Sequence, residues 1–213
     1  MGEPVTVAVV EDDPDVRELH CLRLREEYDV VTMADGTEAL RRIEGEEVLL
    51  LDRRLPGPDG DTVTRRLRSR GYHGAIAMVT GERPDPAVAD LPVDEYVLKP
   101  LDGAELRSLV DRLERRLDVT EPVRELLAMV SRRARLEELD DGPRMVDSEA
   151  YRSLLRRIDR QYRRVLDDVD SPDRIATVAS ETLDPTIDPP DVLEKSRKTV
   201  RSIESTPGTG QEL

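Results

Sequence analysis

Five short segments of apolar and β-branched residues, separated by segments with helical periodicity, constrain the fold of this chain most strongly. The expected helices lie at 14–28, 35–46, 60–71, 85–91 and 102–117, and the expected strands lie at 5–10, 29–33, 48–51, 75–80 and 95–99. Alternating strands and helices predict a parallel sheet with helices on both faces, because parallel neighbours need a crossover connection. The nearly continuous apolar strands are typical of a sheet buried on both faces.

The expected first helix has a mixed composition. Its helical spacing predicts that Val16, Leu19 and Leu22 share one apolar face, to which Cys21 could also belong. His20 lies in the same segment and His73 lies far along the chain, and neither has a second metal ligand at close spacing. We therefore interpret both histidines as surface or helix residues.

The apolar run VLLL leads directly into Asp52, and a charge at the end of a buried strand needs a partner. A buried carboxylate is costly unless it is paired or bound to a metal. In parallel α/β sheets, functional groups lie at the carboxyl ends of the strands. At that edge the sequence also places Glu11 and Asp12 after the first strand, Thr80 at the end of the fourth and Lys99 at the end of the fifth.

The segments VVEDDP, LLLDRRLPGPDG, MVTG and YVLKP occur in this order between residues 5 and 117. Together they resemble the receiver domain of two-component response regulators, and their joint order and spacing are far more specific than any one of them. The resemblance implies a flavodoxin-like (βα)5 fold over residues 1–118, with the sheet order 2-1-3-4-5. It also implies that a sensor histidine kinase is the phosphoryl donor.

The same resemblance assigns a role to each polar residue at the sheet edge. Asp52 is expected to accept the phosphoryl group. Asp12, Asp52 and the backbone carbonyl of Arg54 would bind Mg²⁺ directly, and Glu11 would act on the ion through water. Clustered carboxylates repel one another without a cation, and a hard divalent ion suits oxygen ligands. Lys99 would neutralise charge on the transferring oxygens.

Three further roles concern the switch and the lifetime of the phosphoryl group. Thr80 would donate its hydroxyl to the phosphoryl group, for which Gly81 leaves room. Tyr96 matches the family's switch aromatic, and its ring would move inward when Thr80 is drawn to the phosphate. Arg54 and Glu82 flank the site, and we predict that they pair across its mouth and slow attack by water. Taken singly, most of these residue types have ordinary structural roles, as helix-entry acids, strand ends, surface charges or core aromatics.

Residues 119–170 change to a purely helical pattern, with helices expected at 121–139 and 147–170 around a DDGP break. The second helix carries a heptad seam, which predicts a helical hairpin or a coiled coil with another chain. The seam consists of Tyr151, Leu155, Ile158, Tyr162, Val165 and Val169. Its position and pattern resemble the HalX domain of haloarchaeal proteins. Residues 171–213 are rich in Ser, Thr, Pro and acids and predict a disordered tail, with a transient helix at 191–204.

The charge balance bears on the source and the partners of the protein. Acidic residues number 47 against 33 basic ones, for a net charge of -14, and 30 of the basic residues are arginine. This composition resembles that of proteins from salt-loving archaea, although codon bias is an alternative explanation. Cys21 is the single cysteine, so no internal disulfide is expected. The chain shows no signal peptide and no apolar run of about 20 residues, which predicts a cytoplasmic protein without membrane contact.

Two output functions remain open at this point. The first is a phosphoacceptor, and not a turnover enzyme, that switches the protein contacts of its helical region, with a homodimer through either region as one arrangement. The second is a transcriptional regulator whose helical region contacts DNA or the transcription machinery, although a net charge of -14 repels DNA at low salt. An aspartate-nucleophile phosphatase is disfavoured, because those enzymes need a second aspartate where this chain has Arg54.

Overall fold

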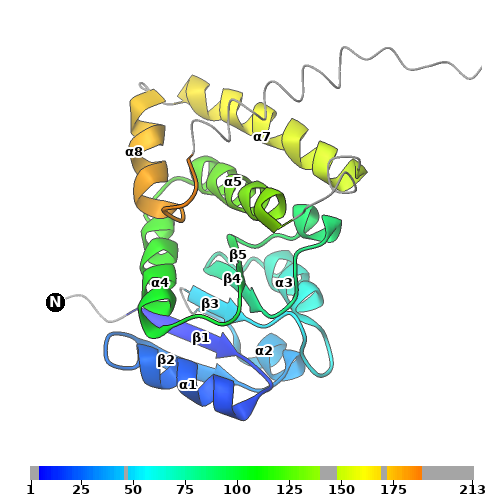
Figure 1. Ribbon diagram of the computed structural model, residues 1–213, viewed down its shortest axis with the longest axis vertical. Helices are drawn as coiled ribbons and strands as arrows, with labels where there is room; N and C mark the ends of the chain where they lie inside the picture. Colours follow the sequence, from blue (N-terminus) through cyan, green and yellow to red (C-terminus); the bar gives the residue numbers. More distant parts are fainter. Residues whose placement is uncertain (1–4, 46–47, 140–147, 169–171, 189–213) are drawn as a thin grey trace, which may run out of the picture.

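The computed structural model describes residues 5–45, 48–139, 148–168 and 172–188 (Figure 1). Five parallel strands form one sheet in the order β2-β1-β3-β4-β5, which confirms the predicted flavodoxin-like arrangement. The strands are β1 (Thr6–Val10), β2 (Asp29–Met33), β3 (Val48–Leu51), β4 (Ala75–Thr80) and β5 (Glu95–Leu98). Their order reverses direction at β1, so the ends of β1 and β3 meet where a ligand site is expected.

Each strand is followed by a helix that begins at an aspartate. The helices are α1 (Pro14–Leu24), α2 (Gly36–Arg42), α3 (Gly60–Ser69), the 3-10 helix η1 (Pro86–Asp90) and α4 (Gly103–Leu117). The carboxylates of Asp13, Asp35, Asp59, Asp85 and Asp102 cap these helices by accepting backbone N–H groups of the first turn. The fourth crossover is thus a single short 3-10 helix, which leaves the adjoining part of the sheet open for other elements.

Two apolar layers cover the sheet. α1 and α4 pack on one face, where Leu24 and Leu109 meet strand residues such as Val9 and Leu50. α2 and α3 pack on the other face, and Val63 and Leu67 belong to that cluster. In the part of the chain that the structure describes, no helix is both long and apolar enough to cross a lipid bilayer.

The structure corrects two predictions for α1. Leu19 and Leu22 were expected in the core, but each is 43% exposed. His20 and Leu24 are buried instead, so His20 is the helix residue that the prediction allowed and not a surface residue. Because these two residues are four apart, they lie one turn above the other on the same helical face. The inward face of α1 is therefore rotated from the one that the leucines suggested.

Three more helices follow α4, namely α5 (Glu121–Leu139), α7 (Glu149–Asp168) and α8 (Pro172–Thr182). α5 packs against β5 and η1, and α7 packs on α5 and η1 (Figure 1). Gln161 of α7 donates to the backbone oxygen of Pro122 at 2.9 Å, and Tyr151 donates to Glu137. These contacts join the end of each helix to the beginning of the other, so α5 and α7 form an antiparallel pair.

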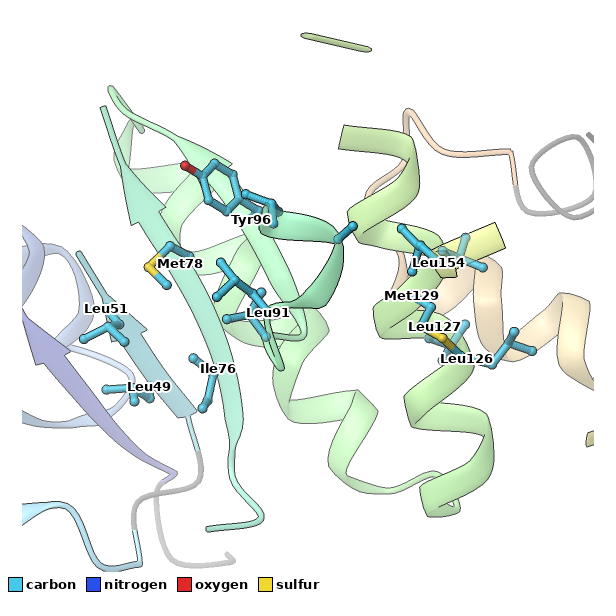
Figure 2. Packing of buried hydrophobic residues seen from close by; sticks show 14 of the residues in the cluster. Leu49, Leu51, Ile76, Met78, Leu91, Tyr96, Leu126, Leu127, Met129 and Leu154 are labelled. Carbon is cyan, nitrogen blue, oxygen red and sulfur yellow. The ribbon is translucent and has the colours of Figure 1, made fainter. Parts of the chain in front are cut away.

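α5 is enclosed by protein along most of its length. Its apolar residues Leu126, Leu127 and Met129 share one cluster with Leu154 of α7 and with Leu91, which follows η1 (Figure 2). The same cluster continues to the sheet residues beneath, including Ile76 and Met78. The helices after residue 118 therefore share a core with the sheet. The predicted domain boundary at residue 118 stays a prediction.

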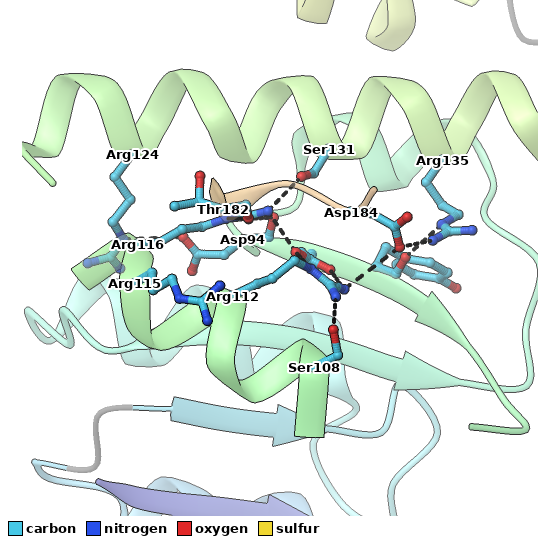
Figure 3. Close-up of polar contacts among 12 residues, drawn as sticks. Asp94, Ser108, Arg112, Arg115, Arg116, Arg124, Ser131, Arg135, Thr182 and Asp184 are labelled. Carbon is cyan, nitrogen blue, oxygen red and sulfur yellow. Dashed lines mark hydrogen bonds and ion pairs between the residues drawn. The ribbon is translucent and has the colours of Figure 1, made fainter. Parts of the chain in front are cut away.

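A buried group of charged and polar residues also joins these helices to the sheet (Figure 3). We call this group the arginine joint, and it consists of Arg116 with Asp94, Glu95, Ser131 and Thr182. The Arg116 guanidinium is 0% exposed and donates to Glu95 at 2.7 Å and to the backbone oxygen of Asp94 at 2.8 Å. It also donates to the Thr182 backbone oxygen and the Ser131 hydroxyl, at 2.9 and 3.1 Å. One side chain thus ties α4, β5, α5 and α8 together.

The prediction of a disordered tail from residue 171 was wrong for residues 172–182, which form α8. Ile175, Ala179 and Leu183 are buried, and α8 packs against α4. These three residues are four positions apart, so they form one apolar face of the helix. The mostly polar composition of the segment hides this face in the sequence. The rest of the predicted tail from residue 189, including the transient helix at 191–204, lies outside the described residues.

Candidate functional site

The predicted acidic residues meet at the carboxyl ends of β1 and β3. Glu11, Asp12 and Asp52 each offer one carboxylate oxygen, and these oxygens lie within 4.8 Å of one another. Strand pairing creates this arrangement, since the Asp52 backbone N–H donates to the Val10 oxygen at 2.9 Å. Glu11 and Asp52 are buried, whereas Asp12 is exposed. The cluster therefore opens to solvent at Asp12 and can hold a divalent cation there.

Lys99 brings a positive charge to the buried side of this cluster. Its ammonium lies 2.5 Å from Glu11 Oε2 and 3.5 Å from Asp52 Oδ1. The backbone N–H of Lys99 donates to the Thr80 oxygen at 2.8 Å, which fixes the position of the lysine relative to β4. The peptide bond between Lys99 and Pro100 is cis. Burial raises the pKa of Glu11 above its usual value, and the contact with Lys99 opposes part of that rise.

Thr80 and Asp52 are both held at the mouth of the site by backbone contacts. The Asp52 carboxylate accepts the backbone N–H of Arg53 at 2.8 Å. Thr80 is almost fully buried, and its hydroxyl accepts the backbone N–H of Glu82 at 3.3 Å. Gly81, which follows Thr80 in the chain, is exposed. A Cβ atom added to Gly81 would have no heavy atom within 4 Å outside its chain neighbours, which agrees with the space for a phosphoryl group that was expected there.

The loop between β3 and α3 is held close to Asp52 by a glycine. A Cβ atom on Gly60 would lie 2.5 Å from the Asp52 backbone oxygen and 2.8 Å from the Arg53 Cα. The Gly60 N–H donates to the Arg53 oxygen at 2.8 Å. Only a residue without a side chain allows this approach, so the LPGPDG loop returns α3 directly beneath the acidic cluster.

The two consecutive arginines after Asp52 have different environments. Arg54 is 78% exposed and forms the predicted ion pair with Glu82. Arg53 is 11% exposed and binds both carboxylate oxygens of Asp61, at 3.0 and 3.1 Å, and also Asp85 at 2.9 Å. Burial alone would lower the pKa of Arg53, but these two acidic partners raise it well above the usual range. Both arginines line a cavity of about 920 Å³ beside the acidic cluster.

Tyr96 already lies inward in this structure. Its side chain is buried with 2% exposure beside Met78 and Leu91 (Figure 2). The phenol donates to the Glu82 backbone oxygen at 2.9 Å. Burial raises the pKa of Tyr96 to about 12, and the nearby Arg53 opposes part of that rise. The inward movement predicted on phosphorylation stays a prediction.

Sequence reasoning missed the network around Arg53. Its acidic partners are Asp61, in the first turn of α3, and Asp85, the cap of η1. The sequence did contain a signal for these contacts. Asp61 stands at the start of the helix after β3 and Asp85 at the start of the helix after β4, and both strands end at the edge of the sheet where Arg53 lies. The predicted contact of the Arg54 backbone carbonyl with a metal ion stays a prediction, and so does the water-mediated role of Glu11.

Comparisons with known proteins point to one family. Residues 7–111 match the family model "Response regulator receiver domain". Over 136 residues the chain is 37% identical to a Haloferax volcanii protein named "Putative transcriptional regulator", covering 63% of this chain and 23% of the relative. Over 122 residues it is 41% identical to the Pseudomonas aeruginosa transcriptional regulatory protein AruR, covering 52% of this chain and 50% of that protein. The chain thus spans half or less of the length of these relatives.

The fold has solved counterparts as well. A signal receiver domain from Vibrio parahaemolyticus superposes with a TM-score of 0.51 at 20% identity, covering 55% of this chain and 94% of the other. At this identity the likeness concerns the fold alone, and it agrees with the sheet order described above.

Proposed function

Because residues 7–111 are a two-component response regulator receiver domain, we propose that Asp52 accepts a phosphoryl group from a sensor histidine kinase and that the helices after residue 118 carry the response. The geometry of Asp52 is the observation that supports this most directly. Its carboxylate lies at the end of a buried strand, between the Asp12 side of the acidic cluster and the Lys99 ammonium, and Asp12 lines the neighbouring cavity. Few other structural roles require three carboxylates and a lysine at one sheet edge.

The proposed transfer is a displacement at phosphorus. An Asp52 oxygen attacks the phosphorus of a phosphohistidine, the P–N bond breaks, and its electron pair returns to the imidazole nitrogen. Lys99 stabilises the negative charge on the phosphoryl oxygens throughout. Mg²⁺ bound by Asp12 and Asp52 would supply a second positive charge on the open side of the site. Attack by water on the same phosphorus later releases inorganic phosphate and restores the carboxylate, so we propose a phosphoacceptor and not a turnover enzyme.

The proposed response passes through α5. The guanidinium of Arg135 on α5 donates to the Tyr96 backbone oxygen at 3.1 Å, so a movement of β5 at Tyr96 reaches this helix directly. The phosphorylated state would change which partners α5 and α7 contact, including a second copy of the chain. We further propose a HalX-like identity for residues 119–170, from their position and heptad seam, and a cytoplasmic protein of a salt-loving archaeon, in keeping with its acidic composition.

The chemistry can be tested with a small phosphodonor. We expect acetyl phosphate with Mg²⁺ in high salt to add one phosphoryl group to the wild-type chain, as measured by intact mass. Asp52→Asn should gain none. Asp13→Asn is the matched control, because Asp13 is an exposed helix cap next to the cluster and asparagine caps equally well. No adduct on the wild-type chain, or equal adducts on wild type and Asp52→Asn, would overturn the proposal.

A second candidate for the response is contact with DNA. Two relatives are named as transcriptional regulators. The helix α7 lies on the outside of the molecule (Figure 1), and its residues Arg160, Arg163 and Arg164 are exposed. Side chains of this kind bind phosphates of a duplex, and such binding weakens steeply with salt. An exposed arginine row on the outermost helix is the observation that favours this candidate in spite of the net negative charge.

This candidate is separable from protein contact by a salt titration. A labelled DNA duplex should bind the phosphorylated chain with a salt dependence that becomes shallower when Arg160, Arg163 and Arg164 are all changed to glutamine. The matched control changes three exposed arginines at α3, which are Arg65 and Arg66 in the helix and Arg70 at its C-terminal cap. Equal salt dependence in the two triple variants would exclude α7 as the DNA surface.

A further inference from the structure

Arg53 is the residue of the site that neither the phosphoryl chemistry nor the cation site uses. Its backbone N–H contacts Asp52, but its side chain turns away from the acidic cluster. An arginine buried to this degree loses hydration, so its position has to be supported by several partners. The partners come from three different elements, which are α3, η1 and β5.

The first two partners are carboxylates. Asp61 accepts from two nitrogens of the guanidinium, at 3.0 and 3.1 Å, and Asp85 lies 2.9 Å from a third. Such paired contacts fix the plane of a guanidinium as well as its position. Arg53 therefore links the loop after β3 to the loop after β4, on the two sides of the phosphoryl site.

The third partner is Tyr96. The Arg53 guanidinium lies 3.5 Å from the phenol oxygen and 6.0 Å from the centre of the ring. The phenol donates in turn to the Glu82 backbone oxygen, in the same loop as Asp85. Arg53 thus holds the ring from its polar end, while Met78 and Leu91 belong to the apolar cluster that includes the ring.

We propose that Arg53 is a positioning residue that keeps Tyr96 in its buried position before phosphorylation. This inference rests on the proposed function, since it concerns the switch of the same site. The Arg53 contacts add to the apolar packing of the ring and to its hydrogen bond with Glu82, so we expect a phosphoryl group on Asp52 to change the ring position little. The response then passes through the loop at Glu82 and Asp85 and through the Tyr96 backbone, whose oxygen contacts Arg135.

The test observes Tyr96 directly. The chain is labelled with 3-fluorotyrosine, and its ¹⁹F spectrum is recorded with and without Mg²⁺ and beryllium fluoride, a phosphoryl analogue. A Tyr96→Phe variant assigns the signal among the five tyrosines. In the wild-type chain we expect one Tyr96 signal in both states. In Arg53→Met we expect a second, solvent-exposed population without the analogue, about tenfold above its wild-type level, which the analogue removes.

Two further variants separate positioning from general structural damage. Arg54→Met changes the neighbouring arginine, whose side chain is 78% exposed and pairs with the Glu82 carboxylate, and should leave the Tyr96 signal as in wild type. Arg53→Lys restores the charge without the planar fork, and should give an exposed population between those of wild type and Arg53→Met.

The outcomes distinguish this inference from the proposed function. A single buried Tyr96 signal in Arg53→Met, in a chain that still gains the phosphoryl group on Asp52, would overturn the positioning role alone. A wild-type chain whose Tyr96 ring moves from an exposed to a buried position on adding the analogue would also overturn it. A wild-type chain that gains no phosphoryl group contradicts the proposed function itself, whatever the Tyr96 spectrum shows.

Discussion

Replacing Arg116 with methionine removes the centre of the arginine joint while keeping a side chain of similar length. Glu95 then loses its contact at 2.7 Å but keeps Arg112, whose guanidinium lies 3.3 Å away. The backbone oxygens of Asp94 and Thr182 lose their arginine donor, at a cost of about 1–3 kcal/mol for each buried acceptor left unsatisfied. Breaking one side of a buried ion pair typically costs about 3–5 kcal/mol. We expect the free energy of unfolding to fall by about 3–5 kcal/mol.

The assay is equilibrium unfolding in urea at constant salt, followed by circular dichroism. The matched control is Arg115→Met in the same helix, because Arg115 is exposed and has one long contact, to the Glu181 oxygen at 3.4 Å. That variant should change the free energy by less than about 0.5 kcal/mol. The double variant Arg116→Met with Glu95→Gln should recover part of the loss, since it removes the buried acid whose arginine partner is gone. An Arg116→Met variant within about 1 kcal/mol of wild type would refute this view of the joint.

Two further predictions concern single residues. The variant Arg54→Ala removes the exposed ion pair with Glu82 and should shorten the half-life of the phosphoryl group about two- to fivefold, which is the range that an exposed pair can supply. The half-life is measured by intact mass, and an unchanged value would contradict the proposed role of Arg54 and Glu82. Burial, with smaller contributions from Lys99 and Arg23, lowers the pKa of His20 to about 4, below its value of about 6.5 in an unfolded chain. The unfolded state then binds the extra proton between these values, so this stability is complete above about pH 6.5 and is lost as the pH falls toward 4. Between pH 7.5 and 5, wild type should lose about 2 kcal/mol more than His20→Gln in urea unfolding, and equal losses would refute the assignment.

The sheet and the acidic cluster were predictable because they depend on local signals. The predicted limits of the strands at 48–51 and 75–80 agree with the structure, since apolar runs bounded by polar turns leave little choice. Glu11, Asp12 and Asp52 could be placed together because parallel strands bring their carboxyl ends to one edge. The predicted pairing of Arg54 with Glu82 followed from opposite charges at that edge.

The errors concern features that depend on distant parts of the chain. The inward face of α1 is decided by its packing against β2 and α4, which its own leucines do not report. The burial of Arg116 depends on partners from β5, α5 and α8 and from Asp94 just before β5, so helical periodicity would assign this residue to a solvated face. α8 was hidden for the same reason, because its apolar spacing has meaning only beside α4.

The buried position of the arginine joint separates two kinds of electrostatic contact in this molecule. Dissolved ions screen charges over about 8 Å at physiological salt and about 3 Å at 1 M, but only where the ions can approach. The Arg116 guanidinium is 0% exposed and is shielded from them, whereas Arg54 is 78% exposed and fully subject to screening. Rising salt therefore weakens the contact at the mouth of the phosphoryl site and leaves the attachment of the helices intact. We therefore expect higher ionic strength to shorten the lifetime of a phosphoryl group on Asp52, in so far as the Arg54–Glu82 pair protects it, without loosening the helices from the sheet.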